Sequence, residues 1–204
     1  MAWFERHASE LERLEFSRLT ELYALLKRWK ESVPDLPWKP VQEFEANLQS
    51  DRFQLDDFLY EETGAEMIAS LKASLRAVLL DWENVFEGLR TKKSPLLSRA
   101  LRLAEEEALR YSSAQWKDRS DDRFPSLGPV FAAYRETPFY TLYRDQLVII
   151  RQTEGELLFF THHPVLDLES AWMRGFVAAL RPSVHVEPFD FGSRMAFAWR
   201  EIPA

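Results

Sequence analysis

Two adjacent histidines, His162 and His163, come closest to a metal site in this sequence, and Pro164 follows them. Adjacent residues of a strand point to opposite faces, so one metal ion cannot bind both imidazoles unless the chain bends. Histidine-only zinc sites need three converging ligands, and His7 and His185 are far away in the sequence. We therefore predict no metal site and interpret these histidines as hydrogen-bonded structural residues.

A polar segment at residues 118–126 is a second candidate, because it mixes acidic and basic side chains: Asp118, Arg119, Asp121, Asp122 and Arg123. Two carboxylates can work as general acid and base where a desolvated cleft separates their pKa values. The mixed charges are more typical of a solvated surface loop. A small-molecule hydrolase would need this loop and the histidine pair to meet in one cleft.

The common catalytic signatures are absent from the sequence. It has no cysteine, which excludes disulfides, thiolate nucleophiles and cysteine zinc sites. Its six glycines form no phosphate-binding loop or dinucleotide fingerprint, and neither Gly-x-Ser-x-Gly nor His-Glu-x-x-His occurs. We predict no catalytic residue and no cofactor, and we favour a protein that is not an enzyme.

Composition limits the partners of this chain of 204 residues. The 46% hydrophobic and 14% aromatic content is typical of a filled globular core, and the net charge of −7 argues against nucleic acid and anionic membranes. No apolar run approaches the length of a membrane span, and the first residues carry charges where a signal peptide needs an apolar core. We predict a cytoplasmic protein.

Aromatic residues near the C-terminal end are the candidates for binding. We predict that five of them line an apolar pocket for a small hydrophobic ligand: Phe160, Trp172, Phe176, Phe197 and Trp199. The set could extend to four more: Phe139, Tyr140, Tyr143 and Phe159. The alternative is that all of them form an ordinary core, since aromatic side chains dominate domain interiors.

The elements that position these side chains are predicted as a ββαββ unit. Two β-branched and aromatic runs, 146–152 and 156–162, flank a short turn with a glycine, which predicts a hairpin. Both runs are apolar without alternation, so we expect both faces of this hairpin to be covered. A helix at 168–180 follows, with Asp167 as its N-cap and Glu169 in its first turn.

A second hairpin, with strands at 183–189 and 194–201, closes the unit. On its last strand the large residues Met195, Phe197 and Trp199 point one way and the two alanines between them point the other. This pattern suits a sheet with a core on one side and a close-fitting surface opposite. Pro188 lacks an N–H, so its strand should be an edge or carry a bulge.

Helices are predicted in the first half, from apolar residues at three- and four-residue spacing. They cover 9–32, 41–49, a turn or two at 55–60, 64–90 and 95–117. The helix at 64–90 follows a capping box at Thr63 and would be about 40 Å long, either a central buried rod or half of a dimer seam. Ser94 and Pro95 open the last one, whose small residues would let another helix approach closely.

These elements predict an α+β fold, with N-terminal helices followed by a small antiparallel sheet of ββαββ order. We predict an N-terminal helix or arm at 1–33 and a single α+β domain at 41–204. The domain would have a helical part at 41–117 and the ββαββ part at 142–202. An amphipathic stripe alone leaves open whether the arm packs on its own domain or on a neighbouring subunit.

The closing stretch, HHPVLDLESAWMRGFVAALRPSVHVEPFDFGSRMAFAWREI, resembles the end of the 4-vinyl-reductase-like domains, which share a superfamily with the heme nitric-oxide sensors and the TRAPP vesicle-tethering subunits. The similarity lies in the helix with Trp172 and Gly175, the following strand, the glycine turn and the final aromatic strand. It implies an apolar pocket for lipids, aromatic compounds or porphyrins, and dimerisation through helices. Where the family has cysteines this chain has His162-His163 and Phe191. No residue of this chain matches a proximal heme histidine within a family motif, so no heme and no catalytic residue is carried over. A hydrolase family similar to aminothiazoline-carboxylate hydrolase has a similar end and also relies on cysteines.

We therefore expect a non-enzymatic ligand-binding or regulatory module that forms a homodimer through its long helices. One alternative is a structural or adaptor protein that acts through its helical surface, which the heptad-like run at 68–89 favours. The other is the small-molecule hydrolase.

Overall fold

The structure is a computed structural model and describes residues 10–35, 64–116, 124–143, 147–161, 166–191 and 194–202. The chain divides into two compact units, Met1–Val85 and Phe86–Ala204. The predicted division between residues 33 and 41 stays a prediction. The predicted helices at 41–49 and 55–60 lie outside the described residues.

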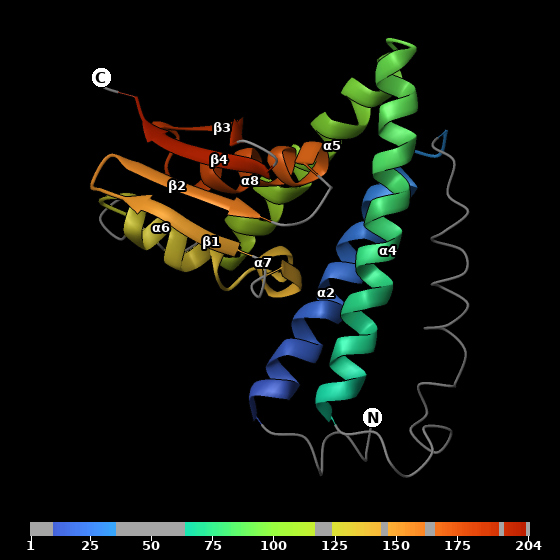
Figure 1. Cartoon of the computed structure of the whole chain (residues 1–204), viewed down its shortest axis with the longest axis horizontal. Helices are drawn as coiled ribbons and strands as arrows, with labels where there is room; N and C mark the ends of the chain where they lie inside the picture. The colour runs from blue at the N-terminus through green and yellow to red at the C-terminus, as the bar shows by residue number, and fades with distance from the viewer. Residues whose placement is uncertain are drawn as a thin grey trace. The chain divides into compact units, whose positions relative to one another are not determined.

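The first unit is built on α2 (Glu10–Ser32) and most of α4 (Gly64–Thr91), which occupy the segments predicted to be helical. The ammonium of Lys72 lies 3.0 Å from the carboxylate of Glu15, and the rings of Trp29 and Trp82 lie 5.0 Å apart between centroids. The residues of the second contact lie further along both helices than the residues of the first contact. Helices α2 and α4 therefore run parallel, as Figure 1 shows.

Most of the apolar stripe of α4 is buried in the single chain. Ile68, Leu71, Leu75, Val78 and Trp82 are at most 7% exposed, whereas Val85 and Leu89, at its C-terminal end, are partly exposed. A dimer seam would need this stripe on the surface, so the burial of the first five residues argues against a seam there, and the central rod stays a prediction.

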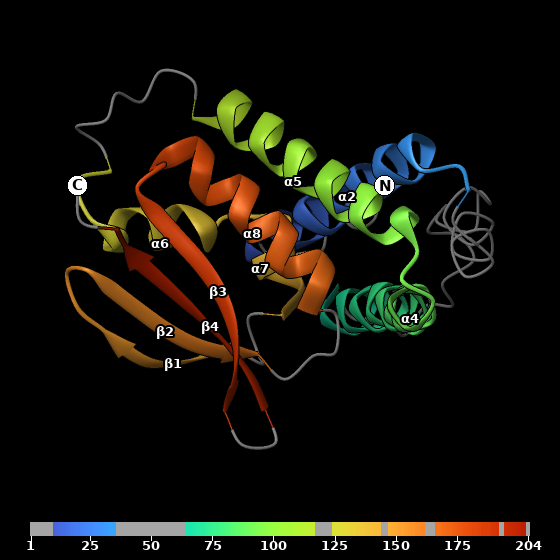
Figure 2. The same cartoon turned by 90° about the horizontal axis from the view of Figure 1, so that it is seen from above.

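The second unit combines helices with a four-stranded antiparallel sheet in the order β1-β2-β4-β3. The helices α5, α6 and α8 lie on one side of the sheet (Figure 2). This arrangement confirms the α+β class and the ββαββ order. The elements in chain order are α5 (Pro95–Gln115), α6 (Leu127–Tyr134), α7 (Pro138–Tyr143), β1 (Leu147–Gln152), β2 (Glu156–Thr161), α8 (Leu166–Leu180), β3 (Val184–Phe191) and β4 (Arg194–Glu201).

Helix α5 begins as predicted and packs closely on α8. The hydroxyl of Ser94 accepts a hydrogen bond from the N–H of Leu96 at 3.3 Å, which caps the helix. On α8, a Cβ built on Gly175 would lie 2.0 Å from the backbone oxygen of Glu105. Only glycine fits there, and the buried face of α5 is made of small residues: Ala100, Ala104, Ala108 and Ser112. The prediction that these residues admit a neighbouring helix is confirmed.

The two faces of β4 differ in side-chain size between residues 196 and 199, as predicted. Leu157 pairs with Trp199 and Phe159 pairs with Phe197 on the face that meets α6, where Phe131 contacts both Phe159 and Trp199. On the opposite face the partners on β4 are the alanines at 196 and 198. Because paired residues share a face, the register places the large and small residues of β4 on opposite sides.

Two details of the sequence prediction are wrong. The first hairpin is not covered on both faces, since Val148, Ile149 and Ile150 are 38–45% exposed. The reason is that β1 is an edge strand with a single neighbour, and a bulge between Ile149 and Arg151 interrupts its register. In addition α8 begins at Leu166, so Asp167 lies inside the first turn, where its carboxylate pairs with Arg90 instead of serving as the N-cap.

The proline in β3 has the predicted consequence. Pro188 lies in the other edge strand of the sheet, opposite Phe197 of β4. An edge strand tolerates proline because an N–H missing from its outer side breaks no ladder bond.

Candidate functional site

Four of the five residues predicted to bind a ligand lie together in the core of the second unit. Trp172 and Phe176 come from α8, Phe197 and Trp199 come from β4, and all four are 0–2% exposed. Phe197 joins the group through Phe159, with ring centroids 5.6 Å apart. The others are connected through ring contacts of 5.3–6.2 Å along one series: Trp172, Tyr111, Trp116, Phe176, Tyr134 and Trp199.

The fifth predicted residue, Phe160, lies on the other face of the sheet. It pairs with Ala196, whereas its neighbour Phe159 pairs with Phe197 on the side of the helices. Successive residues of a strand point to opposite faces. The structure therefore does not bring Phe160 to the other four side chains.

The local sequence explains why α8 and β4 present these rings to each other. On α8, Trp172 and Phe176 are four residues apart, and Glu169 precedes Trp172 by three, so all three share one side of the helix. On β4, Phe197 and Trp199 are two residues apart and share one face of the strand.

A buried polar pair, which the sequence did not reveal as a pair, lies inside this aromatic cluster. The hydroxyl of Tyr134 on α6 donates a hydrogen bond to the carboxylate of Glu169 at 3.2 Å, and the two residues are 0% and 1% exposed. Burial, and then the negative charge of Glu169, raises the pKa of Tyr134 well above its ordinary value. The phenol therefore stays protonated and acts as a hydrogen-bond donor. A carboxylate in the first turn of α8 also faces the positive end of the helix dipole.

Two indole groups of the cluster are buried donors. The Nε1 atoms of Trp172 and Trp199 are inaccessible to solvent and have no hydrogen-bond acceptor among the described residues. An indole N–H can only donate. Both groups belong to the set that the sequence predicted for ligand binding.

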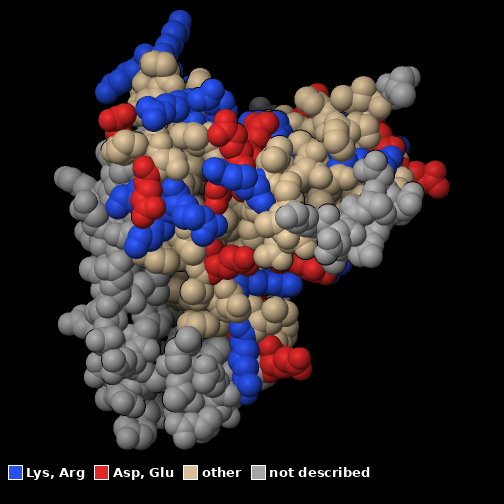
Figure 3. Space-filling view, turned by 180° about the vertical axis from the view of Figure 1, so that it is seen from behind, with Lys and Arg blue, Asp and Glu red and all other residues tan. Residues whose placement is uncertain are grey.

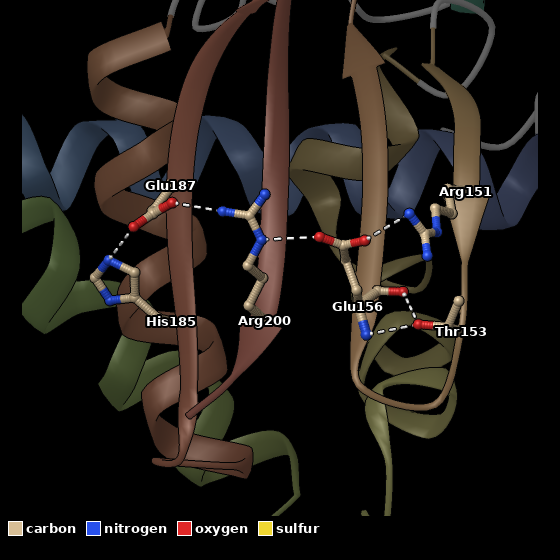
Figure 4. Close-up of polar contacts among 6 residues, drawn as sticks. All are labelled: Arg151, Thr153, Glu156, His185, Glu187 and Arg200. Carbon is tan, nitrogen blue, oxygen red and sulfur yellow. Dashed lines mark hydrogen bonds and ion pairs between the residues drawn. The ribbon is translucent and has the colours of Figure 1, made fainter. Parts of the chain in front are cut away.

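A second group of polar side chains crosses the face of the sheet that points away from α5, α6 and α8 (Figure 4). Glu156 on β2 lies between Arg151 on β1, at 3.5 Å, and Arg200 on β4, at 2.9 Å. Arg200 also contacts Glu187 on β3 at 3.0 Å, and Glu187 lies 3.2 Å from His185. We call these five residues the charged row.

The charged row follows from the register of the sheet. Glu156 pairs directly with Arg200, and Arg200 pairs with His185, which puts them on one face. The hydrogen bond with Glu156 raises the pKa of Arg200 further. The side chains are half exposed at Arg200 and Glu187, so solvent screens the row and it contributes little to stability. No local sequence pattern identifies it, because its members come from four different strands.

The turn of the first hairpin fixes the position of Glu156. The backbone N–H of Thr153 donates to the carbonyl of Glu156 at 2.8 Å, and the Thr153 hydroxyl accepts a bond from the Glu156 N–H at 3.1 Å. This closes the hairpin next to the charged row.

The adjacent histidines and the acidic loop, which were the catalytic candidates of the sequence, are not among the residues that the structure describes. His162, His163, Asp118, Asp121 and Asp122 lie outside the described residues. Within the part of the chain that is described, no three histidine, aspartate or glutamate side chains form a group able to hold a metal ion. On the face drawn in Figure 3, acidic and basic side chains of the described residues are interspersed.

Comparison with known proteins adds no assignment: no family model and no curated protein matches this chain. None of the described helices is long and apolar enough to cross a membrane.

Proposed function

We propose that this protein is a non-enzymatic ligand-binding or regulatory module whose small-molecule ligand binds between the sheet and α8. The ligand would contact Trp172, Phe176, Phe197 and Trp199. The observation that carries the proposal is the pair of buried indole N–H groups, on Trp172 and Trp199, without an acceptor among the described residues.

A buried donor without a partner is costly. It loses its hydrogen bonds to water on folding, at about 1–3 kcal/mol for each group, and at least about nine in ten buried polar groups in native proteins have a partner. Two such donors in one aromatic cluster, on α8 and β4, favour acceptors from outside the described part of the chain. A molecule with an aromatic or aliphatic body and a carbonyl or carboxylate oxygen has the matching chemistry, because the rings around it are apolar.

Native mass spectrometry of the freshly purified protein, compared with the denatured mass of the same sample, tests this proposal. We expect an additional non-covalent mass in the wild type. Trp172→Phe and Trp199→Phe keep an aromatic ring but remove the N–H donor together with part of the ring volume, so they should lose most of the bound mass. Trp82→Phe, in the first unit, is the matched control and should retain it.

A bare polypeptide mass in the wild type would contradict the proposal. Ordered water would then satisfy the two indoles, and the aromatic set would be an ordinary core. The same conclusion would follow if the bound mass were equal in all three tryptophan variants.

The alternative of an adaptor that acts through its helices has less support. It relied on the apolar run of α4, and the residues of that run from Ile68 to Trp82 are buried in the single chain, while Val85 and Leu89 are partly exposed. The homodimer and the cytoplasmic location stay predictions. The hydrolase alternative depends on residues outside the described part of the chain.

A further inference from the structure

The outer edge of β1 has the features of a docking strand. β1 ends the sheet, and no described backbone group forms a hydrogen bond with its outer side. Its consecutive side chains Val148, Ile149 and Ile150 are exposed. Exposed apolar strands at a sheet edge pair readily with a further strand, because their N–H and C=O groups are also available.

The other edge of the sheet is protected in the way that natural proteins protect edges. β3 carries Pro188 and the exposed polar side chains of His185 and Glu187. A proline and charged residues disfavour the addition of a strand. β1 contains no proline. Its bulge shortens the edge that a partner strand can use but does not block that edge.

The charged row indicates which partner strand would fit. From β3 to β1 its charges alternate, with Glu187 negative, Arg200 positive, Glu156 negative and Arg151 positive. The row ends at Arg151, whose side chain is 63% exposed. A fifth strand beside β1 would place its own side chain next to Arg151, and a carboxylate there would continue the alternation. Opposite charges on facing strands stabilise a sheet and like charges destabilise it.

We propose that β1 binds an extended segment of a partner protein as a fifth strand, with an acidic side chain next to Arg151 and apolar side chains next to Val148 and Ile149. A second copy of β1 does not meet this requirement, since its residues LVIIRQ include no carboxylate. Because β1 has only six residues and a bulge, the contact is short. It belongs to the weak, transient class of interactions.

Binding of synthetic peptides to the full chain tests the proposal. The probe is a short fluorescent peptide with valines at the positions beside Val148 and Ile149, a glutamate at the position beside Arg151, and soluble flanks. A second peptide has lysine in place of the glutamate, and a third carries N-methyl groups that block its backbone donors. Fluorescence polarisation gives the affinities. Hydrogen exchange shows whether the amides of 147–152 become protected.

We expect the glutamate peptide to bind about fivefold more tightly than the lysine peptide and to protect β1, and the N-methylated peptide not to bind. Arg151→Glu should reverse the preference between the two charged peptides. Arg102→Glu, which makes the same charge change at an exposed position on α5, should leave it unchanged.

Equal binding of both charged peptides, insensitivity to N-methylation or no binding at millimolar peptide would overturn the proposal. It would also be overturned if the chain formed a dimer that Ile149→Lys dissociates, because a second copy would then occupy the edge.

Discussion

Replacing Gly175 with alanine tests the close packing of α5 and α8. A Cβ at this position would lie 2.0 Å from the backbone oxygen of Glu105 and 3.0 Å from the Cβ of Ala108. The nearer obstacle belongs to the backbone of a helix and cannot rotate away as a side chain would. Because real Cβ contacts are not found below 3.0 Å, the helices must move apart locally by about 1 Å, which loosens a close-packed interface.

The size of the effect follows from two opposing contributions. Forcing an extra methyl group into a packed interior costs about 1–3 kcal/mol, and a contact this short with the backbone belongs at the top of that range. Alanine also favours the helix over glycine by about 1 kcal/mol. We therefore expect Gly175→Ala to lower the free energy of unfolding by about 2 kcal/mol.

Gly88→Ala is the matched control for this substitution. Gly88 is also helical and belongs to the same unit, and a Cβ there would have nothing within 4 Å. Only the helix propensity changes, so the control should be stabilised by about 0.5–1 kcal/mol. The difference between the two variants, about 3 kcal/mol, measures the packing cost alone.

Urea unfolding followed by far-UV circular dichroism gives both free energies, from the midpoint and the slope of the transition. If Gly175→Ala unfolds at the same urea concentration as the wild type or a higher one, while Gly88→Ala is stabilised, the close approach of α5 and α8 is refuted.

Two further substitutions test the buried polar pairs. Burial and Glu169 raise the pKa of Tyr134 above 10, so at higher pH the unfolded chain loses a proton that the folded chain retains, and stability falls as pH rises. Tyr134→Phe should remove up to about 1.4 kcal/mol per pH unit of this decrease in the free energy of unfolding. Urea unfolding between about pH 9 and 11 measures it. If the free energy of unfolding fell equally with pH in the wild type and the variant, the raised pKa of Tyr134 would be contradicted. Lys72→Met should cost about 3 kcal/mol, because it removes the buried ammonium from the carboxylate of Glu15. The double variant Glu15→Leu/Lys72→Met should recover most of that loss, and a double variant as unstable as the single one would speak against the pair.

The helices of this fold could be predicted from sequence because their signals are local. In the sequence Thr63 comes directly before α4 and Glu66 lies in its first turn, and Ser94 with Pro95 marks the start of α5. The small residues on one face of α5 also predicted a closely packed neighbouring helix. That helix is α8, which approaches the backbone of α5 at Gly175. In each case a few residues within one or two turns contain the information.

The candidate site was predictable only in part. Sequence spacing places Trp172 and Phe176 on one face of α8, and Phe197 and Trp199 on one face of β4, and these four residues do gather in the core. The pairing of Tyr134 with Glu169 spans 35 residues and depends on how α6 packs on α8. A signal was present, since Glu169 precedes Trp172 by three residues and so lies on the apolar face of the helix, where an acid requires a buried partner.

The failed prediction for the first hairpin has a topological cause. The runs at 147–150 and 157–160 are both wholly apolar, yet Phe159 is fully buried whereas Ile149 is 45% exposed. The difference arises because β4 pairs with β2 and not with β1, so that β2 has two neighbours and β1 has one. Nothing local in either run specifies that long-range pairing. An apolar run predicts that a strand needs cover on both faces, but it does not say that the chain itself supplies the cover. For β1 the described chain leaves this need unmet, and an acidic partner strand beside Arg151 would meet it.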